Sequence, residues 1–174
     1  MGLLKRLRHL HLAAVIAASL PLLATPVFAA CTQDRAVYTD KDDDYTLTFK
    51  RVPDDAEDAS NEFSLQLNET DLRLDGVVAW TEEVARPNGT ISYKCPPAKT
   101  GEELDACTVW QGVIYALTEG ADADLLPKAK EPAAQALLLP DLTSAMTRYN
   151  FKLDKPVEAF PWEVFRFKEC VPEQ

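Results

Sequence analysis

The chain has no histidine after position 30, and this absence excludes several kinds of chemistry. Both histidines, His9 and His11, lie among the first thirty of its 174 residues. Without a histidine base, the rest of the chain cannot build a Ser-His-Asp or Cys-His catalytic system. Zinc, copper and haem sites lose their commonest ligand, and a pH switch near neutrality loses its usual carrier.

Other signatures of catalysis and cofactor binding are missing as well. The sequence contains neither the Gly-x-Ser-x-Gly nor the Ser-x-x-Lys pattern of serine nucleophiles, and it has no Cys-x-x-Cys redox motif. Only five glycines follow the first thirty residues, and they form no phosphate-binding loop. The sequence therefore favours a protein that is not an enzyme and that uses no cofactor and no metal.

The first thirty residues have the three parts of a bacterial secretory signal peptide. A start with Lys and Arg precedes a mostly apolar stretch over residues 10–23, and residues 27–30 offer small side chains to a signal peptidase. Proline interrupts the apolar stretch, which is shorter than the ~20 residues of a membrane helix. We expect residues 1–30 to be removed and residues 31–174 to form a single periplasmic or secreted domain without a membrane span.

A lipid anchor through Cys31 is the alternative, because this cysteine directly follows the expected cleavage point. Bacterial lipid-attachment sites usually have Leu, Val or Ile where this chain has Phe28. Lipidation of Cys31 would also leave an odd number of cysteines in an oxidising compartment. The parity therefore favours Cys31 in a disulfide.

The four cysteines predict a disulfide framework, since paired cysteines persist outside the cytosol. Four cysteines allow three pairings, and we predict Cys95–Cys107 and Cys31–Cys170. The first bridge would close the loop over residues 96–106, and the second would tie the two ends of the exported domain together. A bridge that closes so long a loop stabilises by about 4 kcal/mol through the entropy of the unfolded chain.

The exported part of the chain is strongly acidic. Three of the 18 Lys and Arg residues lie in the leader, so residues 31–174 carry 15 basic and 28 acidic residues, a net charge of −13. This charge excludes nucleic acid and anionic membrane surfaces as partners, since both need Lys and Arg. It serves solubility first. The more specific interpretation is a basic protein or peptide partner.

Alternating apolar and polar residues predict strands in the first two-thirds of the domain. Residues 45–50 and residues 63–68 alternate in this way, and residues 72–85 form a longer candidate. Asn88-Gly89 predicts the turn of a hairpin, because both residues tolerate positive φ. Residues 107–118 are apolar on both faces, which predicts a central strand.

The last third changes character. A helix is expected over residues 133–139, and a second one after Asp141, where Leu142, Ala145 and Met146 recur at helical spacing. An aromatic strand is expected over residues 161–168. The prediction is an α+β fold that is mainly an antiparallel sheet, with one or two short helices of the C-terminal half packed on one face and disulfides as staples.

The strongest candidate binding surface is the acidic tip of the hairpin between the first two predicted strands. It contains four carboxylates in five residues, namely Asp54, Asp55, Glu57 and Asp58.

A second acidic run, Asp40 to Asp44, does not fit a helix-loop-helix calcium site. Tyr45 stands where that site needs glycine, and Arg51 where it needs glutamate. Among the aromatic residues, Trp110 and Trp162 have apolar neighbours and are expected in the core. Polar residues follow Trp80, so its place in the core or on the surface stays open.

These observations predict a non-enzymatic exported binding or accessory protein, monomeric, that engages a basic partner through an acidic surface. The alternative is a carboxylate-dependent hydrolase that acts on envelope carbohydrate. It would need two facing carboxyl groups about 5–10 Å apart. Glu82, Glu83, Glu119 and Asp141 are the candidates for such a pair.

Overall fold

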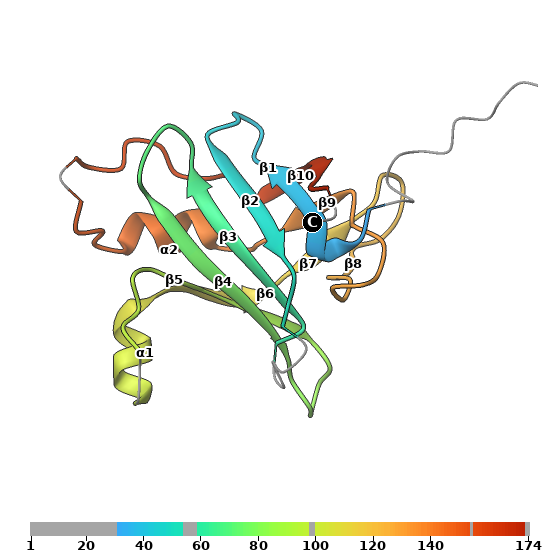
Figure 1. Cartoon of the computed structure of the whole chain (residues 1–174), viewed down its shortest axis with the longest axis horizontal. Coiled ribbons are helices and arrows are strands. Elements are labelled where there is room, and N and C mark those ends of the chain that lie inside the picture. Colours follow the sequence, from blue (N-terminus) through green and yellow to red (C-terminus); the bar gives the residue numbers. More distant parts are fainter. Residues whose placement is uncertain (1–30, 54–58, 98–99, 154, 173–174) are drawn as a thin grey trace, which may run out of the picture.

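The computed structural model describes residues 31–53, 59–97, 100–153 and 155–172. Its main element is one antiparallel sheet, whose strands follow the order β6-β5-β4-β3-β2-β1-β10-β9-β7-β8 (Figure 1). In chain order the strands are β1 (Ala36–Thr39), β2 (Tyr45–Lys50), β3 (Asn61–Leu67), β4 (Arg73–Trp80), β5 (Pro87–Ser92), β6 (Thr108–Val113), β7 (Tyr115–Leu117), β8 (Asp124–Leu125), β9 (Ala136–Leu138) and β10 (Val164–Cys170).

Two α-helices and a short 3-10 helix accompany the sheet in the described part of the chain. The 3-10 helix η2 spans Gln33–Arg35, α1 spans Gly101–Cys107 and α2 spans Leu142–Arg148. The predicted dominance of antiparallel sheet over helix is therefore confirmed. No helix among the described residues is long and apolar enough to cross a membrane.

Ile114 joins the two ends of the sheet. β6 is the first strand in the sheet order and β7 is the last but one, yet Ile114 alone separates them in the chain. Its amide donates to the Pro87 carbonyl at 3.2 Å, and its carbonyl accepts from the Leu126 amide at 3.3 Å. The sheet therefore curls into a half-barrel. The predicted strand character of residues 107–118 is confirmed by β6 and β7. That they form one central strand is wrong, because β6 lies at the edge of the sheet and the chain crosses to its other end at Ile114.

The core lies on the inner face of the curled sheet, and the predicted alternation in β2 and β3 is confirmed. Tyr45, Leu47 and Phe49 of β2 are at most 3% exposed, and Phe63 and Leu65 of β3 are fully buried. The register places Leu47 opposite Leu65 and Phe49 opposite Phe63. These cross-strand apolar pairs stabilise the sheet and define its register.

The predicted hairpin turn at Asn88-Gly89 is wrong. Both residues lie inside β5, and the turn between β4 and β5 spans residues 81–86. Gly89 serves close packing instead, since a Cβ at this position would lie 2.7 Å from Cδ1 of Ile114 and 3.0 Å from Cζ3 of Trp110. Glycine inside a strand often marks such an approach of a neighbouring group.

The helix expected over residues 133–139 is also wrong. Ala136 pairs with Leu117 of β7 on one side and with Arg166 of β10 on the other, so β9 completes the sheet here. Pairing with two neighbouring strands overrides the weak local preference for helix.

α1 was not predicted, although its start has a clear signal. The Thr100 side chain accepts from the Glu103 amide, and the Glu103 carboxylate accepts from the Thr100 amide. This reciprocal pair is a capping box.

α2 confirms the second predicted helix. Leu142 and Met146 are fully buried and belong to the main hydrophobic core. Asp141 is the residue before the helix, as expected, but it has φ 62° and its side chain makes no capping hydrogen bond.

The disulfide pairing is the predicted one. Cys31 bonds Cys170 across a sequence separation of 139 residues, and Cys95 bonds Cys107 across 12 residues. Disulfides are compatible with folding outside the cytosol.

Candidate functional site

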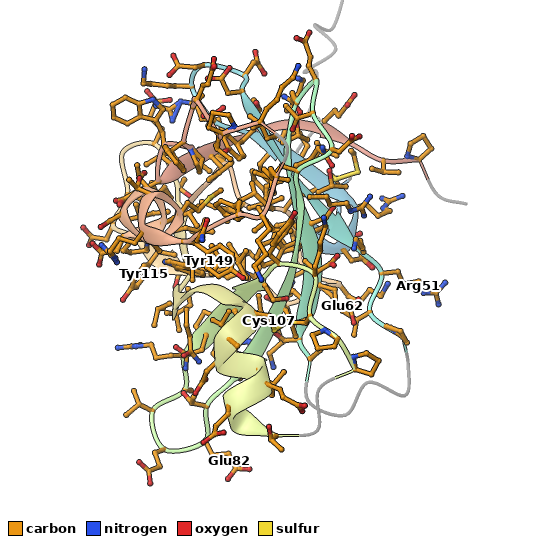
Figure 2. The ribbon with its side chains drawn as sticks, turned by 90° about the vertical axis from the view of Figure 1, so that its left-hand side faces the viewer. Arg51, Glu62, Glu82, Cys107, Tyr115 and Tyr149 are labelled. Carbon is orange, nitrogen blue, oxygen red and sulfur yellow. A yellow bond between two sulfur atoms is a disulfide. The ribbon has the colours of Figure 1, made fainter. Side chains whose placement is uncertain are left out.

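The sequence-predicted acidic tip, Asp54 to Asp58, lies outside the described residues. The candidate hydrolase carboxylates lie on connections between strands and helices. Glu82 and Glu83 lie at the end of the β4–β5 hairpin, where Figure 2 shows Glu82 projecting from the molecule. Glu119 follows β7 and Asp141 precedes α2, so the four residues come from three separate connections.

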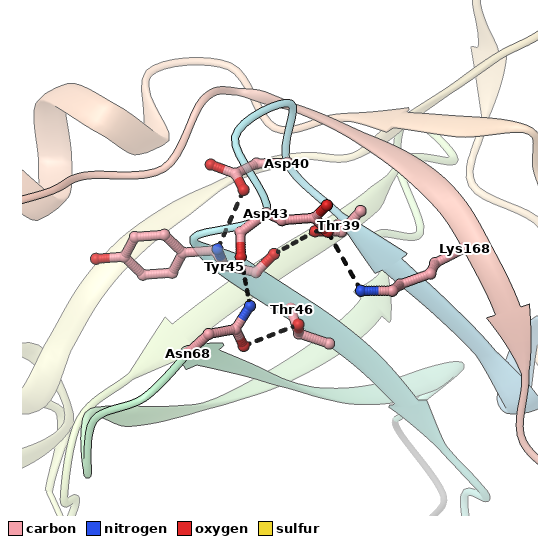
Figure 3. Close-up of polar contacts among 7 residues, drawn as sticks. All are labelled: Thr39, Asp40, Asp43, Tyr45, Thr46, Asn68 and Lys168. Atoms are coloured by element: carbon pink, nitrogen blue, oxygen red, sulfur yellow. Dashed lines mark hydrogen bonds and ion pairs between the residues drawn. The ribbon is translucent and has the colours of Figure 1, made fainter.

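A different acidic surface is formed by two neighbouring turns. The β1–β2 turn and the β3–β4 turn lie side by side at the top of Figure 1, away from the β4–β5 hairpin. Asn68 joins them: its backbone amide donates to the Asp44 carbonyl at 2.8 Å, and its side-chain amide donates to the Asp43 carbonyl at 2.6 Å (Figure 3). The exposed carboxylates of the two turns define the acidic turn surface, namely Asp42, Asp43, Asp44, Glu69 and Asp71.

The aspartates themselves shape the first turn. Asp40 is 3% exposed, and its Oδ1 accepts from the Tyr45 amide at 3.1 Å. Asp43 has φ 58°, a left-handed conformation that aspartate tolerates better than most residues. The Thr39 hydroxyl donates to the Asp43 carboxylate at 2.8 Å and closes the turn (Figure 3). Two of the four carboxylates between residues 40 and 44, those of Asp40 and Asp43, therefore help to hold the turn in shape.

Three carboxylates of the acidic turn surface have no partner of opposite charge among the described residues. Asp42 pairs with Lys41, and Asp43 pairs with Lys168, whereas Asp44, Glu69 and Asp71 make no salt bridge. Five carboxylates against the two ammonium groups leave this surface with three negative charges. Such a surface attracts a basic partner and repels an anionic one.

The pKa values of the paired aspartates are shifted toward the charged form. Hydrogen bonds from Lys41 and from the Trp162 indole lower the pKa of Asp42. Hydrogen bonds from Thr39 and Lys168 lower the pKa of Asp43. The acidic turn surface therefore keeps these two charges at every pH at which an ordinary aspartate is ionised.

Trp162 stands at the edge of this surface and is 52% exposed, so its predicted place in the core is wrong. Its Nε1–H donates to Asp42 Oδ2 at 2.7 Å, and Lys41 Nζ lies 4.2 Å from the ring centroid. Trp110, by contrast, is 3% exposed, as predicted. Trp162 comes before β10, where the alternation that buries Phe165 has not yet begun. The indole is therefore an exposed ring with a defined orientation.

A groove of about 530 Å³ begins at Trp162. Leu138, Phe160 and Val164 supply apolar lining, while Glu163 and Arg166 supply charge. An exposed aromatic ring beside an apolar groove is typical of residues that anchor protein partners.

No group of three or more Asp, Glu, His or Cys residues in the described part of the chain is placed to hold a metal ion. No protein-family profile, curated protein or solved structure matches the chain. The sequence contains one signal for this site, the aspartate run after residue 39, which does not fit a calcium pattern.

Proposed function

We propose that this protein is an exported, non-enzymatic binding protein that engages a basic protein partner through the acidic turn surface. The observation that supports this most directly is the row of unpaired carboxylates, Asp44, Glu69 and Asp71, on two turns that hydrogen bonds hold together. A preformed charged surface speeds association and selects partners of opposite charge.

The site of action is the periplasm or the medium. The signal-like leader and the two disulfides support this location. The net charge of −13 over residues 31–174, from 15 basic and 28 acidic residues, adds long-range attraction for a basic protein. In the proposed monomer, no second copy of the chain covers the acidic turn surface.

Capture from an envelope extract tests the proposal. Tagged residues 31–174 are incubated with extract at about 0.1 M and about 1 M salt, where the Debye length falls from ~10 Å to ~3 Å. We expect basic proteins to bind at low salt and to be lost at high salt. The triple variant Asp44→Asn, Glu69→Gln and Asp71→Asn should lose most of this binding.

A matched control separates local from overall charge. Glu102→Gln, Asp105→Asn and Glu119→Gln remove three charges from exposed residues outside the acidic turn surface. This variant should keep its partners. Equal capture by all three proteins, unchanged at high salt, contradicts the proposal.

A further inference from the structure

We propose that Trp162 and Asp42 form the binding position for an arginine side chain of the basic partner, and that Lys41 occupies this position in the free protein. The inference rests on the proposed function and assigns one contact within it. Lys41, Asp42 and Trp162 come from two segments about 120 residues apart, which meet at the edge of the acidic turn surface.

Lys41 shows that the position accepts a cation. Its Nζ lies 2.9 Å from Asp42 Oδ2 and 4.2 Å from the centroid of the Trp162 ring. The same carboxylate oxygen accepts the indole N–H at 2.7 Å, so ring and carboxylate are held in one fixed relation. A negative charge beside an aromatic face is the combination that binds ammonium and guanidinium groups.

Lys41 is held weakly enough to be displaced. The side chains of Lys41 and Asp42 are 51% and 48% exposed, and exposed ion pairs contribute little free energy because water screens them. Lys41 is also a single point charge. A guanidinium is planar, so it stacks on an indole face and places two N–H groups against one carboxylate. Arginine therefore competes well against the resident ammonium.

The surroundings favour a basic segment over other occupants. Asp43 and Asp44 follow Asp42 on the same turn and add negative charge to it. The groove that Trp162 helps to line offers Leu138, Phe160 and Val164 to the apolar part of a side chain. Glu163 and Arg166 also line the groove and supply one charge of each sign. The occupant is thus a basic segment whose arginine lies at Trp162.

A defined peptide tests the assignment. The probe is an acetylated and amidated peptide of four Arg-Gly repeats with a fluorescent label, and its neutral counterpart has citrulline in place of arginine. Affinity is measured by fluorescence anisotropy at about 0.1 M salt, where exposed charges still interact over ~10 Å. Tryptophan emission reports whether the Trp162 environment changes on binding.

Two lysine variants form a matched pair. Lys41→Met and Lys168→Met each remove one positive charge from the same surface, since Lys168 pairs with Asp43 at 3.2 Å. Only Lys41→Met empties the position over the ring, so it should tighten peptide binding by about threefold to tenfold. Lys168→Met should change the affinity by about twofold or less, as expected for an exposed pair.

Variants of the ring complete the test. Trp162→Leu should weaken binding by about fivefold to tenfold and abolish the emission change. Trp162→Phe keeps an aromatic face but loses the N–H that Asp42 accepts. Its affinity for the peptide should therefore lie between those of wild type and Trp162→Leu. The side chains of Trp162, Lys41 and Lys168 are all about half exposed. All variants should therefore unfold at nearly the same temperature, which circular dichroism checks.

The outcomes separate the two proposals. Binding of the arginine peptide, with the expected differences among variants and no binding of the citrulline peptide, supports the assignment. A second outcome is that the arginine peptide binds with strong salt dependence, but Lys41→Met and Lys168→Met have the same affinity for it and Trp162→Leu binds as tightly as wild type. The acidic turn surface then stands, and the arginine position at Trp162 is wrong. If the peptide does not bind the wild-type protein at all, both proposals fail.

Discussion

Two aspartates are buried, and their surroundings move their pKa values in opposite directions. For Asp34, burial acts against ionisation, but hydrogen bonds from Lys130 and Thr32 and the charges of Lys130 and Arg35 outweigh it, so the pKa lies below its ordinary value. For Asp40, burial outweighs the hydrogen bond from the Tyr45 amide and raises the pKa. Asp40 Oδ2 has no hydrogen-bond partner within the described structure, whereas both oxygens of Asp34 are bonded.

The Asp34 environment makes a prediction about stability and pH. Because its folded-state pKa is lowered, ionised Asp34 stabilises the fold above the unfolded pKa of about 3.9, and this stabilisation is lost as the pH falls through the folded pKa. Lys130→Met removes one of its two side-chain partners. The free energy of unfolding at pH 7 should fall by about 1–3 kcal/mol, measured by urea denaturation.

The pH dependence identifies the cause. The difference between Lys130→Met and wild type should shrink as the pH falls through the lowered folded-state pKa of Asp34, where protonation removes the buried charge. Lys168→Met serves as the control, because its partner Asp43 is exposed and such pairs contribute about 0–1 kcal/mol. A loss that stays constant throughout the acid titration, including the pH range in which Asp34 becomes protonated, would show that Lys130 stabilises by packing alone.

For individual residues, the sequence allowed only part of the candidate site to be predicted. Local composition correctly placed Trp110 in the core and marked the Asp40–Asp44 run as acidic. It misplaced Trp162, because its exposure depends on where β10 begins and on contacts with Asp42, which is 120 positions away. The acidic turn surface forms because Asn68 of the β3–β4 turn hydrogen-bonds to the carbonyls of Asp43 and Asp44, a contact that the local sequence pattern does not reveal.

Individual strands are shaped by contacts across the sheet, as β3 and β4 show. Phe63 faces Gly76 in the antiparallel register, and a Cβ at Gly76 would lie 2.3 Å from the Phe63 ring. The ring therefore occupies the space that a side chain at position 76 would need. β4 continues through Asp75 and Gly76 because the ring covers the glycine.

Gly76→Ala tests this contact. The Phe63 ring must move within a packed core, so we expect a loss of about 1–3 kcal/mol in the free energy of unfolding. Gly101→Ala is the control, since a Cβ there meets nothing within 4 Å and alanine is the better residue in a helix. That variant should be neutral or slightly more stable in the same urea titration. Equal losses for both variants would contradict the packing argument.

The elements that could be predicted are those whose pattern is local. Alternation identified β2 and β3, and helical spacing identified α2. β9 was mistaken for a helix, since its identity depends on pairing with β7 and β10. The Asn88-Gly89 pair was mistaken for a turn, since the need for Gly89 comes from Trp110 and Ile114 in the adjoining segment. Tertiary pairing decided these elements against local preference.

The whole molecule depends on contacts between its distant ends. β1 pairs with β10, and the Val171 amide donates to the Arg35 carbonyl at 2.8 Å, so the first and last described segments lie together. The Cys31–Cys170 disulfide closes this junction across 139 residues, whereas Cys95–Cys107 spans a sequence separation of 12 residues that includes α1. The two bridges restrict the unfolded chain to very different degrees.

Removal of each bridge should therefore have unequal effects. In the entropy model, loss of the long-range bridge costs about 4–5 kcal/mol and loss of the short one about 3 kcal/mol. The paired variants Cys31→Ser with Cys170→Ser and Cys95→Ser with Cys107→Ser are compared by urea denaturation without reductant. The first should be less stable, with a larger m-value because its unfolded chain expands further. If the second pair loses as much stability as the first, local packing around Cys107, which is 6% exposed, matters more than chain entropy.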